Sequence, residues 1–228
     1  MPRPGLLPAD PARPALHLPA GVGALTLGRL HEVCGPDRAT LALMVAGALS
    51  GPVFWIAPAW ASGRLNTDGM APFADPGRFL FAEPRRADDL LWTLEEVLRS
   101  GTVPLAVAEL PQLPGLTPVR RLHLAAEAGA ARAAAAGSRG PVPLGLILTP
   151  GLGGAPGVES RWHMAGAHRP APKHPAAAGT GAQPPGIPGA LRPGWRLTRR
   201  RARTAPPAAW VLSGGPGRWR AVAHPDTD

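Results

Sequence analysis

Residues 35–43 read GPDRATLAL and follow the short apolar run LHEVC. A strand that turns at a glycine and continues as a helix is the setting of a phosphate-binding loop, whose pattern is G-x-x-x-x-G-K-[ST]. In that loop backbone amides wrap the phosphates, the lysine reaches the terminal phosphate and the hydroxyl binds Mg²⁺. Counted from Gly35, the pattern would place glycine at Thr40 and lysine at Leu41. Neither residue can do this chemistry.

Lysine is almost absent from the chain. The only one is Lys173, which lies among prolines far from Gly35, and Arg38 is the only cation near that turn. A bound nucleoside triphosphate would therefore lack the lysine that neutralises its terminal phosphates. We predict that the chain has no nucleotide cofactor and no catalytic residue, and that it is not an enzyme.

The other residues that could do chemistry lack supporting patterns. His163, His168 and His174 match no rigid metal-ligand spacing, so no metal site is predicted. Cys34 is the only cysteine, which excludes an internal disulfide, and its place at the end of an apolar run indicates a small core residue. Ser160 has no nucleophile motif around it.

Positive charge is concentrated in the last third of the chain. Residues 1–160 carry 13 arginines and 13 acidic residues, whereas residues 161–228 hold the whole formal net charge of +9. Arginine forks suit phosphates and carboxylates, and tryptophan can stack on a base or fill a protein pocket. The segment WRLTRRRAR therefore predicts a partner-binding or nucleic-acid-binding site made of Trp195, Arg196, Arg199, Arg200, Arg201 and Arg203. The alternative is a strand whose charged face is only solvated.

From residue 30 to residue 168, apolar runs alternate with helical patterns. This alternation predicts an α/β fold with a mainly parallel sheet and helices on both faces. One helix should stop at Gly101, and another should be capped by Thr117. We expect helices within residues 39–50, 85–101 and 117–137, and strands within 30–34, 52–58, 77–83, 102–110, 142–150 and, at the sheet edge, 159–168.

The flanks are poor in apolar periodicity and rich in glycine and proline. Residues 1–28 are predicted to form an extended arm and residues 169–191 a disordered linker, because neither can bury enough apolar surface. Residues 192–228 are predicted to be a basic tail rich in tryptophan and arginine, with two segments paired across SGGPG. Residues 39–63 carry no charge, but SGP in their middle predicts helix, break and strand rather than a membrane span. We expect a cytoplasmic protein.

The order of these elements resembles RecA, and more closely the ImuA family of short RecA-like proteins. The resemblance covers about residues 28–168 and rests on LHEVCGP with TLAL, RFLFAEPRRADDLLWTLEEVLRSGTVPLAVAEL, RRLHLAAEAG and ESRWHMAG. It implies a RecA-like core at residues 29–168 with a degenerate P-loop. The resemblance also places Pro58 at the position where RecA-like enzymes have a glutamate that activates water. It places Glu109 at the position of the acidic residue associated with magnesium, but we expect Glu109 to have a structural role.

The same resemblance implies a non-catalytic adaptor of the SOS response to DNA damage. Such an adaptor works within a mutasome that carries out error-prone translesion synthesis. The implied partners are an ImuB-type polymerase-like protein, an error-prone C-family polymerase and, as a further candidate, RecA, with a weak DNA contact through the basic tail and no membrane. Two alternatives stay open: a cell-division inhibitor of the SulA type, and a true RecA-like DNA-dependent ATPase, which the missing lysine opposes.

Overall fold

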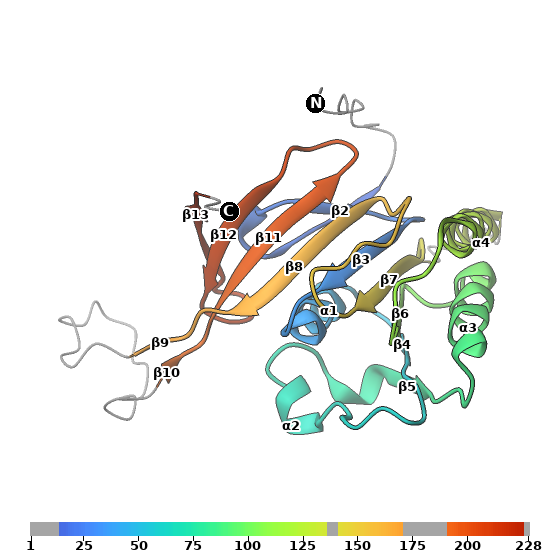
Figure 1. Ribbon diagram of the computed structural model, residues 1–228, viewed down its shortest axis with the longest axis horizontal. Helices are drawn as coiled ribbons and strands as arrows, with labels where there is room; N and C mark the ends of the chain where they lie inside the picture. The colour runs from blue at the N-terminus through green and yellow to red at the C-terminus, as the bar shows by residue number, and fades with distance from the viewer. Residues whose placement is uncertain (1–13, 136–140, 171–190, 226–228) are drawn as a thin grey trace.

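A mixed sheet of nine strands runs through the computed structural model, which describes residues 14–135, 141–170 and 191–225. The strand order is β13-β12-β11-β8-β3-β7-β6-β4-β5 (Figure 1). The strands are β3 (Leu30–Cys34), β4 (Val53–Ile56), β5 (Phe79–Ala82), β6 (Leu105–Glu109), β7 (Leu144–Thr149), β8 (Ser160–Gly166), β11 (Gly194–Ala202), β12 (Ala208–Ser213) and β13 (Arg220–His224).

Six of the strands form a parallel half of the sheet. In the order β5, β4, β6, β7, β3 and β8, each runs parallel to the next. Every residue of β3 and of β7 is buried, which is expected of strands that are covered on both faces. The α/β class and the mainly parallel sheet predicted from the sequence are confirmed.

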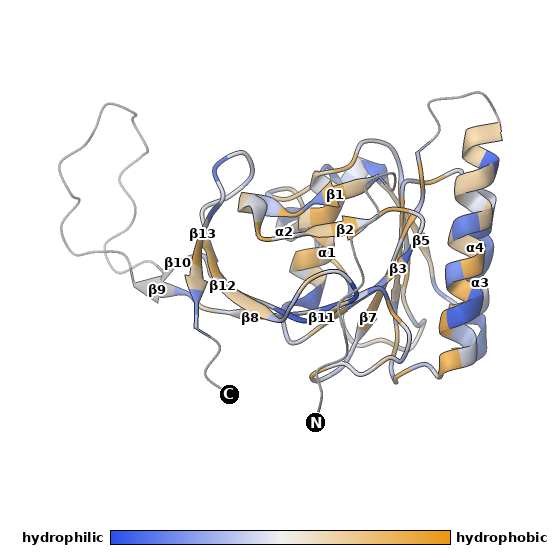
Figure 2. Ribbon diagram, turned by 90° about the horizontal axis from the view of Figure 1, so that it is seen from above, coloured by the Kyte–Doolittle hydropathy of each residue, from blue (hydrophilic) through white to orange (hydrophobic). Residues whose placement is uncertain are grey.

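Helices cover both faces of this parallel half (Figure 2). One face carries α1 (Arg38–Gly47), the one-turn α2 (Thr67–Met70) and the 3₁₀ turn η2 (Pro76–Arg78). The opposite face carries α3 (Ala87–Ser100) and α4 (Leu116–Ala135). The sequence predicted three of these helices and missed α2, which is too short to show a periodicity.

The helix ends agree with the sequence in two places and differ in one. α3 ends at Gly101, whose φ of 70° is the left-handed conformation that commonly closes a helix. α1 ends before SGP and β4 begins after it, as predicted, and no described helix is long and apolar enough to cross a membrane. α4 begins at Leu116, so Thr117 lies inside its first turn and is not the predicted cap.

The antiparallel half of the sheet consists of β11, β12 and β13, joined to β8. β8 therefore lies inside the sheet, between β11 and β3, and not at the edge where the sequence placed it. Leu197 and Leu212 are fully buried in the cluster that also holds α1. The expected tail at residues 192–228 thus contributes strands to the core instead of following a core that ends at residue 168. The predicted pairing across SGGPG is confirmed as the β12–β13 hairpin.

The start of the described chain also differs from the expected extended arm. β1 (Ala15–His17) and β2 (Ala24–Thr26) form a hairpin around the 3₁₀ turn η1 (Pro19–Gly21). Leu18, Val22 and Leu25 are buried in the same cluster as α1, which explains why this stretch is ordered against the sheet. The rest of the predicted arm, residues 1–13, lies outside the described residues.

The expected linker at residues 169–191 is described only at its two ends. β9 (Arg169–Pro170) pairs antiparallel with β10 (Leu191–Arg192). Residues 171–190, which include Lys173 and His174, lie outside the described residues. The ladder brings the two ends of this segment together beside the antiparallel strands (Figure 1).

Two buried histidines join the sheet to its surroundings. The Nε2 of His31 donates to the carbonyl of Thr26 at 3.0 Å, and its Nδ1 accepts from Ser160 Oγ at 2.6 Å. The Nδ1 of His123 accepts from the amide of Leu30 at 3.3 Å, and its Nε2 donates to the carbonyl of Gly157 at 3.1 Å. The amide of Leu30 can only donate, so the Nδ1 of His123 is bare, and burial lowers the pKa of both rings to about 4, so both side chains are neutral at pH 7.

Acid should weaken the fold through these two histidines. Burial lowers the pKa of His31 and of His123 to about 4, so the unfolded chain binds more protons than the folded chain between about pH 6.5 and 4. The free energy of unfolding should therefore fall as the pH falls through this window, by up to about 1.4 kcal/mol per pH unit for each histidine.

Urea denaturation between pH 7 and pH 5 would measure this slope above the range in which most carboxyls titrate. The variant His123→Gln should have a shallower pH dependence, whatever its absolute stability. An equal slope in the two proteins would contradict the assignment.

Candidate partner-binding interface

The turn between β3 and α1 has only three residues, Gly35 to Asp37. Gly35 has a φ of 92°, and a Cβ there would lie 2.3 Å from the carbonyl oxygen of Met164. The amide of Gly35 donates to the carbonyl of Gly151 at 3.0 Å, and that of Asp37 to Met164 at 3.1 Å. Pro36 has no amide hydrogen. The turn therefore directs its amides to neighbouring strands and loops and not to an open cradle.

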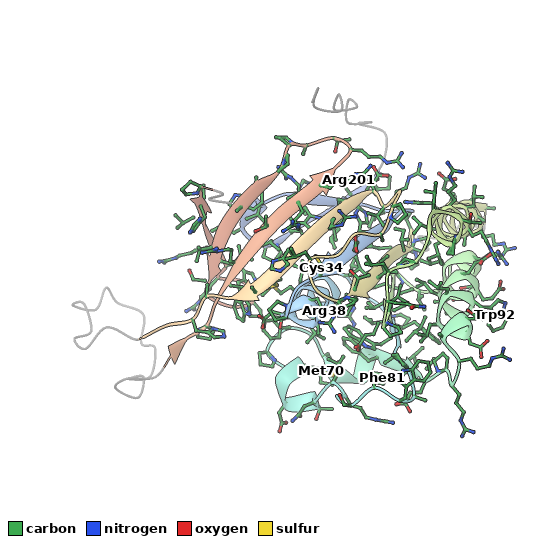
Figure 3. All side chains as sticks on the ribbon, viewed as in Figure 1. Cys34, Arg38, Met70, Phe81, Trp92 and Arg201 are labelled. Carbon is green, nitrogen blue, oxygen red and sulfur yellow. The ribbon has the colours of Figure 1, made fainter. Side chains whose placement is uncertain are left out.

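The first turn of α1 is closed in the same way. The amides of Thr40 and Leu41 both donate to the carbonyl of Asp37, at 3.0 and 3.3 Å. Arg38 bends back, and its Nη1 donates to the carbonyl of Gly35 at 3.2 Å. Figure 3 shows Arg38 next to Cys34 at the end of β3. Arg38, the cation next to this turn in the sequence, is thus already bonded to the backbone.

The two positions that the resemblance links to catalysis line one shallow pocket of about 180 Å³. Pro58 and Glu109 lie in its wall at the carboxyl ends of β4 and β6. The Oε1 of Glu109 accepts a hydrogen bond of 2.7 Å from the indole Nε1 of Trp55. Glu109 therefore has the structural partner that was expected of it.

A buried carboxylate lies behind the β3–α1 turn. Glu32 is fully buried, and it pairs with the guanidinium of Arg161 on β8. It also accepts from Thr149 Oγ1 at 2.7 Å, from the amide of Gly154 at 2.8 Å and from the amide of Ala155 at 3.2 Å. All of its acceptor capacity serves neighbouring chain segments, so this carboxylate is structural.

The nucleophile candidates are enclosed in the core. Burial raises the pKa of the Cys34 thiol to about 11, and the thiol donates to the carbonyl of Trp162 at 3.4 Å. Ser160 pairs with His31, but it also accepts from the indole of Trp162 at 2.8 Å, and the serine and the histidine are both buried. This serine and histidine hold strands together.

Histidines do not gather with other ligands in the described part of the chain. No group of three or more histidine, cysteine, aspartate or glutamate residues in it could hold a metal ion. His168 instead accepts from the amide of Gly194 at 3.2 Å and packs edge-on against Trp195, with ring centroids 6.0 Å apart. His163 faces Thr198 on β11.

The structure divides the predicted binding segment between two faces of β11. Trp195 is buried, with only 6% of its surface exposed. Its ring lies 6.0 Å from Phe73 and 5.7 Å from Trp219, both in edge-on geometry. The sequence offered Trp195 as an anchor for a partner, and the structure shows it anchoring its own strand.

Arg199 lies on the same buried face as Trp195. Its guanidinium carbon is 5.6 Å from the ring centroid of Trp162 and 5.2 Å from that of Trp210, both distances at which cations bind aromatic faces. Its Nε donates to the carbonyl of Pro206 at 2.9 Å. Arg199 is therefore part of the packing beneath the sheet and not a free binding group.

Three of the predicted arginines remain on the opposite face. Arg196, Arg200 and Arg201 are exposed. Arg196 lies between the buried Trp195 and Leu197 along β11, so its side chain is on the other face of the strand. Arg201 is the register partner of Arg161 on the neighbouring strand β8, so these two residues share a face of the sheet. Arg203 lies beyond the strand, with its Nε 3.5 Å from the Glu159 carboxylate. The face that carries Arg196, Arg200 and Arg201 is the surface that could bind a partner.

The sequence analysis did not identify the residues that determine which side chains of this segment are buried and which are exposed. Trp162 and Trp210 hold Arg199 on the buried face, and Arg220 on β13 joins the exposed one. The signal available was the period-two alternation of apolar and charged residues along GWRLT. It predicts the two faces as far as Thr198, before the irregularity at Arg200 shifts the register.

Comparison with known proteins identifies relatives of nearly full length. Protein ImuA from Caulobacter vibrioides, in strains NA1000 / CB15N and ATCC 19089 / CIP 103742 / CB 15, is 29% identical over 229 residues, which cover 89% of this chain and 83% of the relative. The chain is a homologue of ImuA. The ImuA family predicted from the sequence is thereby confirmed, and the similarity extends beyond residues 28–168, on which the resemblance was based.

Two further comparisons complete these findings. No family model matches the chain. The crystal structure of SulA from Pseudomonas aeruginosa matches with a TM-score of 0.41 and 19% sequence identity, covering 54% of this chain and 98% of SulA.

Trp195 and Arg196 should differ sharply in their effect on stability. Trp195→Ala removes a buried aromatic ring and should lower the free energy of unfolding by about 3–5 kcal/mol. Arg196→Ala changes an exposed side chain and should shift it by less than about 0.5 kcal/mol. Chemical denaturation of both variants provides the measurement. A Trp195→Ala protein as stable as the parent would show that the aromatic cluster does not hold β11.

Proposed function

We propose that this homologue of ImuA is a non-catalytic adaptor of an SOS-induced mutasome that supports error-prone translesion DNA synthesis. In this proposal its RecA-like fold carries a degenerate phosphate-binding loop and serves protein contacts. The polymerase chemistry belongs to its partners, an ImuB-type polymerase-like protein and an error-prone C-family polymerase, with RecA as a further partner.

The observation that carries the proposal is the similarity to ImuA over 89% of the chain. A match over 89% of the chain is longer than residues 28–168 and must reach β11 as well as the α/β core. We therefore assign the role to the whole described fold and not to its core alone.

The β3–α1 turn supports the non-catalytic part of the proposal. A phosphate cradle needs free amides and a lysine. Here the amides of Gly35 and Asp37 are bonded to Gly151 and Met164, and the single lysine of the chain is Lys173. A nucleotide bound at this turn would have to break those backbone bonds without the compensating charge.

Exposed leucines at the carboxyl edge of the sheet support the adaptor part. Leu113, Leu116 and Leu152 are 47%, 40% and 59% exposed. The first two lie against the loop after β7, because a Cβ on Gly154 would be 2.9 Å from Leu113 Cδ1 and one on Gly157 would be 2.9 Å from Leu116 Cδ1. Apolar side chains gathered at a loop edge are typical of protein–protein interfaces.

Nucleotide binding tests the non-catalytic role. We expect no heat of ATP binding by calorimetry in the presence of Mg²⁺, and phosphate release at the background rate. Glu109→Ala should change neither result, because Glu109 is bonded to Trp55. Micromolar ATP affinity that is lost in Glu109→Ala would contradict the proposal.

Partner capture tests the adaptor role. We expect the tagged chain to retain an ImuB-type protein from its own genome, and Leu113→Ser with Leu116→Ser to weaken that binding by about tenfold, which corresponds to about 1.4 kcal/mol. Leu124→Ser is the matched control, because Leu124 is 64% exposed but lies about 12 Å further along α4 than Leu116. Recovery from DNA-damaged cells of the tubulin-like division protein alone would favour the SulA-type alternative.

A further inference from the structure

The antiparallel half of the sheet has one uncovered face. α1 and the β1–β2 hairpin lie against one side of β8, β11, β12 and β13, and no described helix lies against the other (Figure 2). We call this other side the open face. By the alternation of strand residues and their pairing, Arg196, Arg200, Arg201, Val211, Arg220 and Val222 belong to it.

A β-bulge increases the charge of the open face. Arg199 pairs with Trp162 and Arg201 with Arg161, so Arg200 is an extra residue without a partner on β8. Burial lowers the pKa of His163, and the charge of Arg200 lowers it further, which places Arg200 near His163 on the open side. Because of the bulge, two consecutive arginines contribute to one face. Figure 3 shows Arg201 near the end of β11.

The segment that builds the open face contains no carboxylate. From Ser160 to Pro225 the sequence has neither aspartate nor glutamate. The nearby Glu32 is paired with Arg161 and Glu159 with Arg203. Asp37 lies beside Gly166, which is opposite Trp195 and so faces the α1 side of the sheet. No ion pair is found for Arg196, Arg200, Arg201 or Arg220 among the described residues. The formal charges on the described part of the open face are therefore all positive.

The tryptophans of the antiparallel strands and of β8 are all directed away from the open face. Trp162, Trp195, Trp210 and Trp219 take part in the cluster on the α1 side. Proteins that bind single strands commonly stack the bases on exposed aromatic rings, and the open face has none to offer. A duplex presents its phosphates outward and needs no stacking platform, so the chemistry of this face fits a duplex backbone best.

We propose that the open face binds duplex nucleic acid through its phosphates, without reading the bases. Arg196 and Arg200 lie about 13 Å apart along β11, and β13 with Arg220 lies about 10 Å across the sheet from β11. Four arginine forks are thus spread over an area that can contact several phosphates at once. This inference does not depend on the adaptor role, since partner capture can succeed or fail independently.

The test is fluorescence anisotropy of the full chain with labelled 20-base-pair DNA duplexes of two unrelated sequences, over a salt series. Four phosphate contacts predict a slope of about −3.6 in log affinity against log salt, equal for both sequences. The triple variant Arg196→Ala, Arg200→Ala, Arg201→Ala should reduce the slope to about −0.9. The corresponding triple lysine variant should keep most of the slope, because phosphate neutralisation needs charge more than fork geometry.

The matched control is Arg85→Ala, Arg86→Ala, Arg120→Ala, which removes the same charge from exposed positions after β5 and on α4, at the opposite end of the sheet from β13 (Figure 1). It should leave the slope at about −3.6. Equal losses in the two alanine variants would mean that binding follows net charge, and the proposal would be wrong. Tighter binding of a single-stranded oligonucleotide than of the duplex would also overturn it. So would binding of a polyglutamate peptide without any DNA binding, because the open face would then fit an acidic protein.

Discussion

The buried pair of Glu32 and Arg161 ties β3 to β8, the last strand of the parallel half. Glu32 belongs to β3, in the parallel half, and Arg161 to β8, to which the antiparallel strands are added. The same carboxylate holds the loop after β7 through Thr149 and the amides of Gly154 and Ala155. Removing one partner of such a pair commonly costs about 3–5 kcal/mol, because the other charge stays buried and unpaired. Together with the β3–β8 backbone ladder, this contact therefore fixes the position of β8 and of the strands added to it.

The aromatic cluster beneath β8, β11 and β12 explains why one face of these strands is dry and the other charged. Trp162 and Trp210 stack with ring centroids 6.3 Å apart, and Phe73 and Trp219 stack at the same distance. With this apolar surface directed toward α1, the arginines that alternate with it must face solvent. Packing and charge are thus two results of the same alternation.

The sequence predicted well what is encoded locally. The acid-rich start of α3 and its stop at Gly101, and the apolar runs of β3 and β7, need only neighbouring residues to be recognised. The placement of β11 beside β8 could not be predicted in this way, because residues 171–190 separate the two strands in sequence. The candidate site was found as a segment, but its division into a buried and an open face depends on that pairing. The bulge at Arg200 arises from the pairing with β8 and has no local signal.

The two-residue ladder of β9 and β10 gives the fold a place where its length can change. Pro170 is the register partner of Leu191, and Arg169 is that of Arg192. The end of β9 and the start of β10 therefore lie side by side. Because the entropy of closing a loop grows only with the logarithm of its length, each doubling of the number of residues inserted between these strands costs about 0.6 kcal/mol. Insertions and deletions between these strands would leave β8 and β11 in register. This position is consequently suited to evolutionary length variation and to the insertion of a reporter domain.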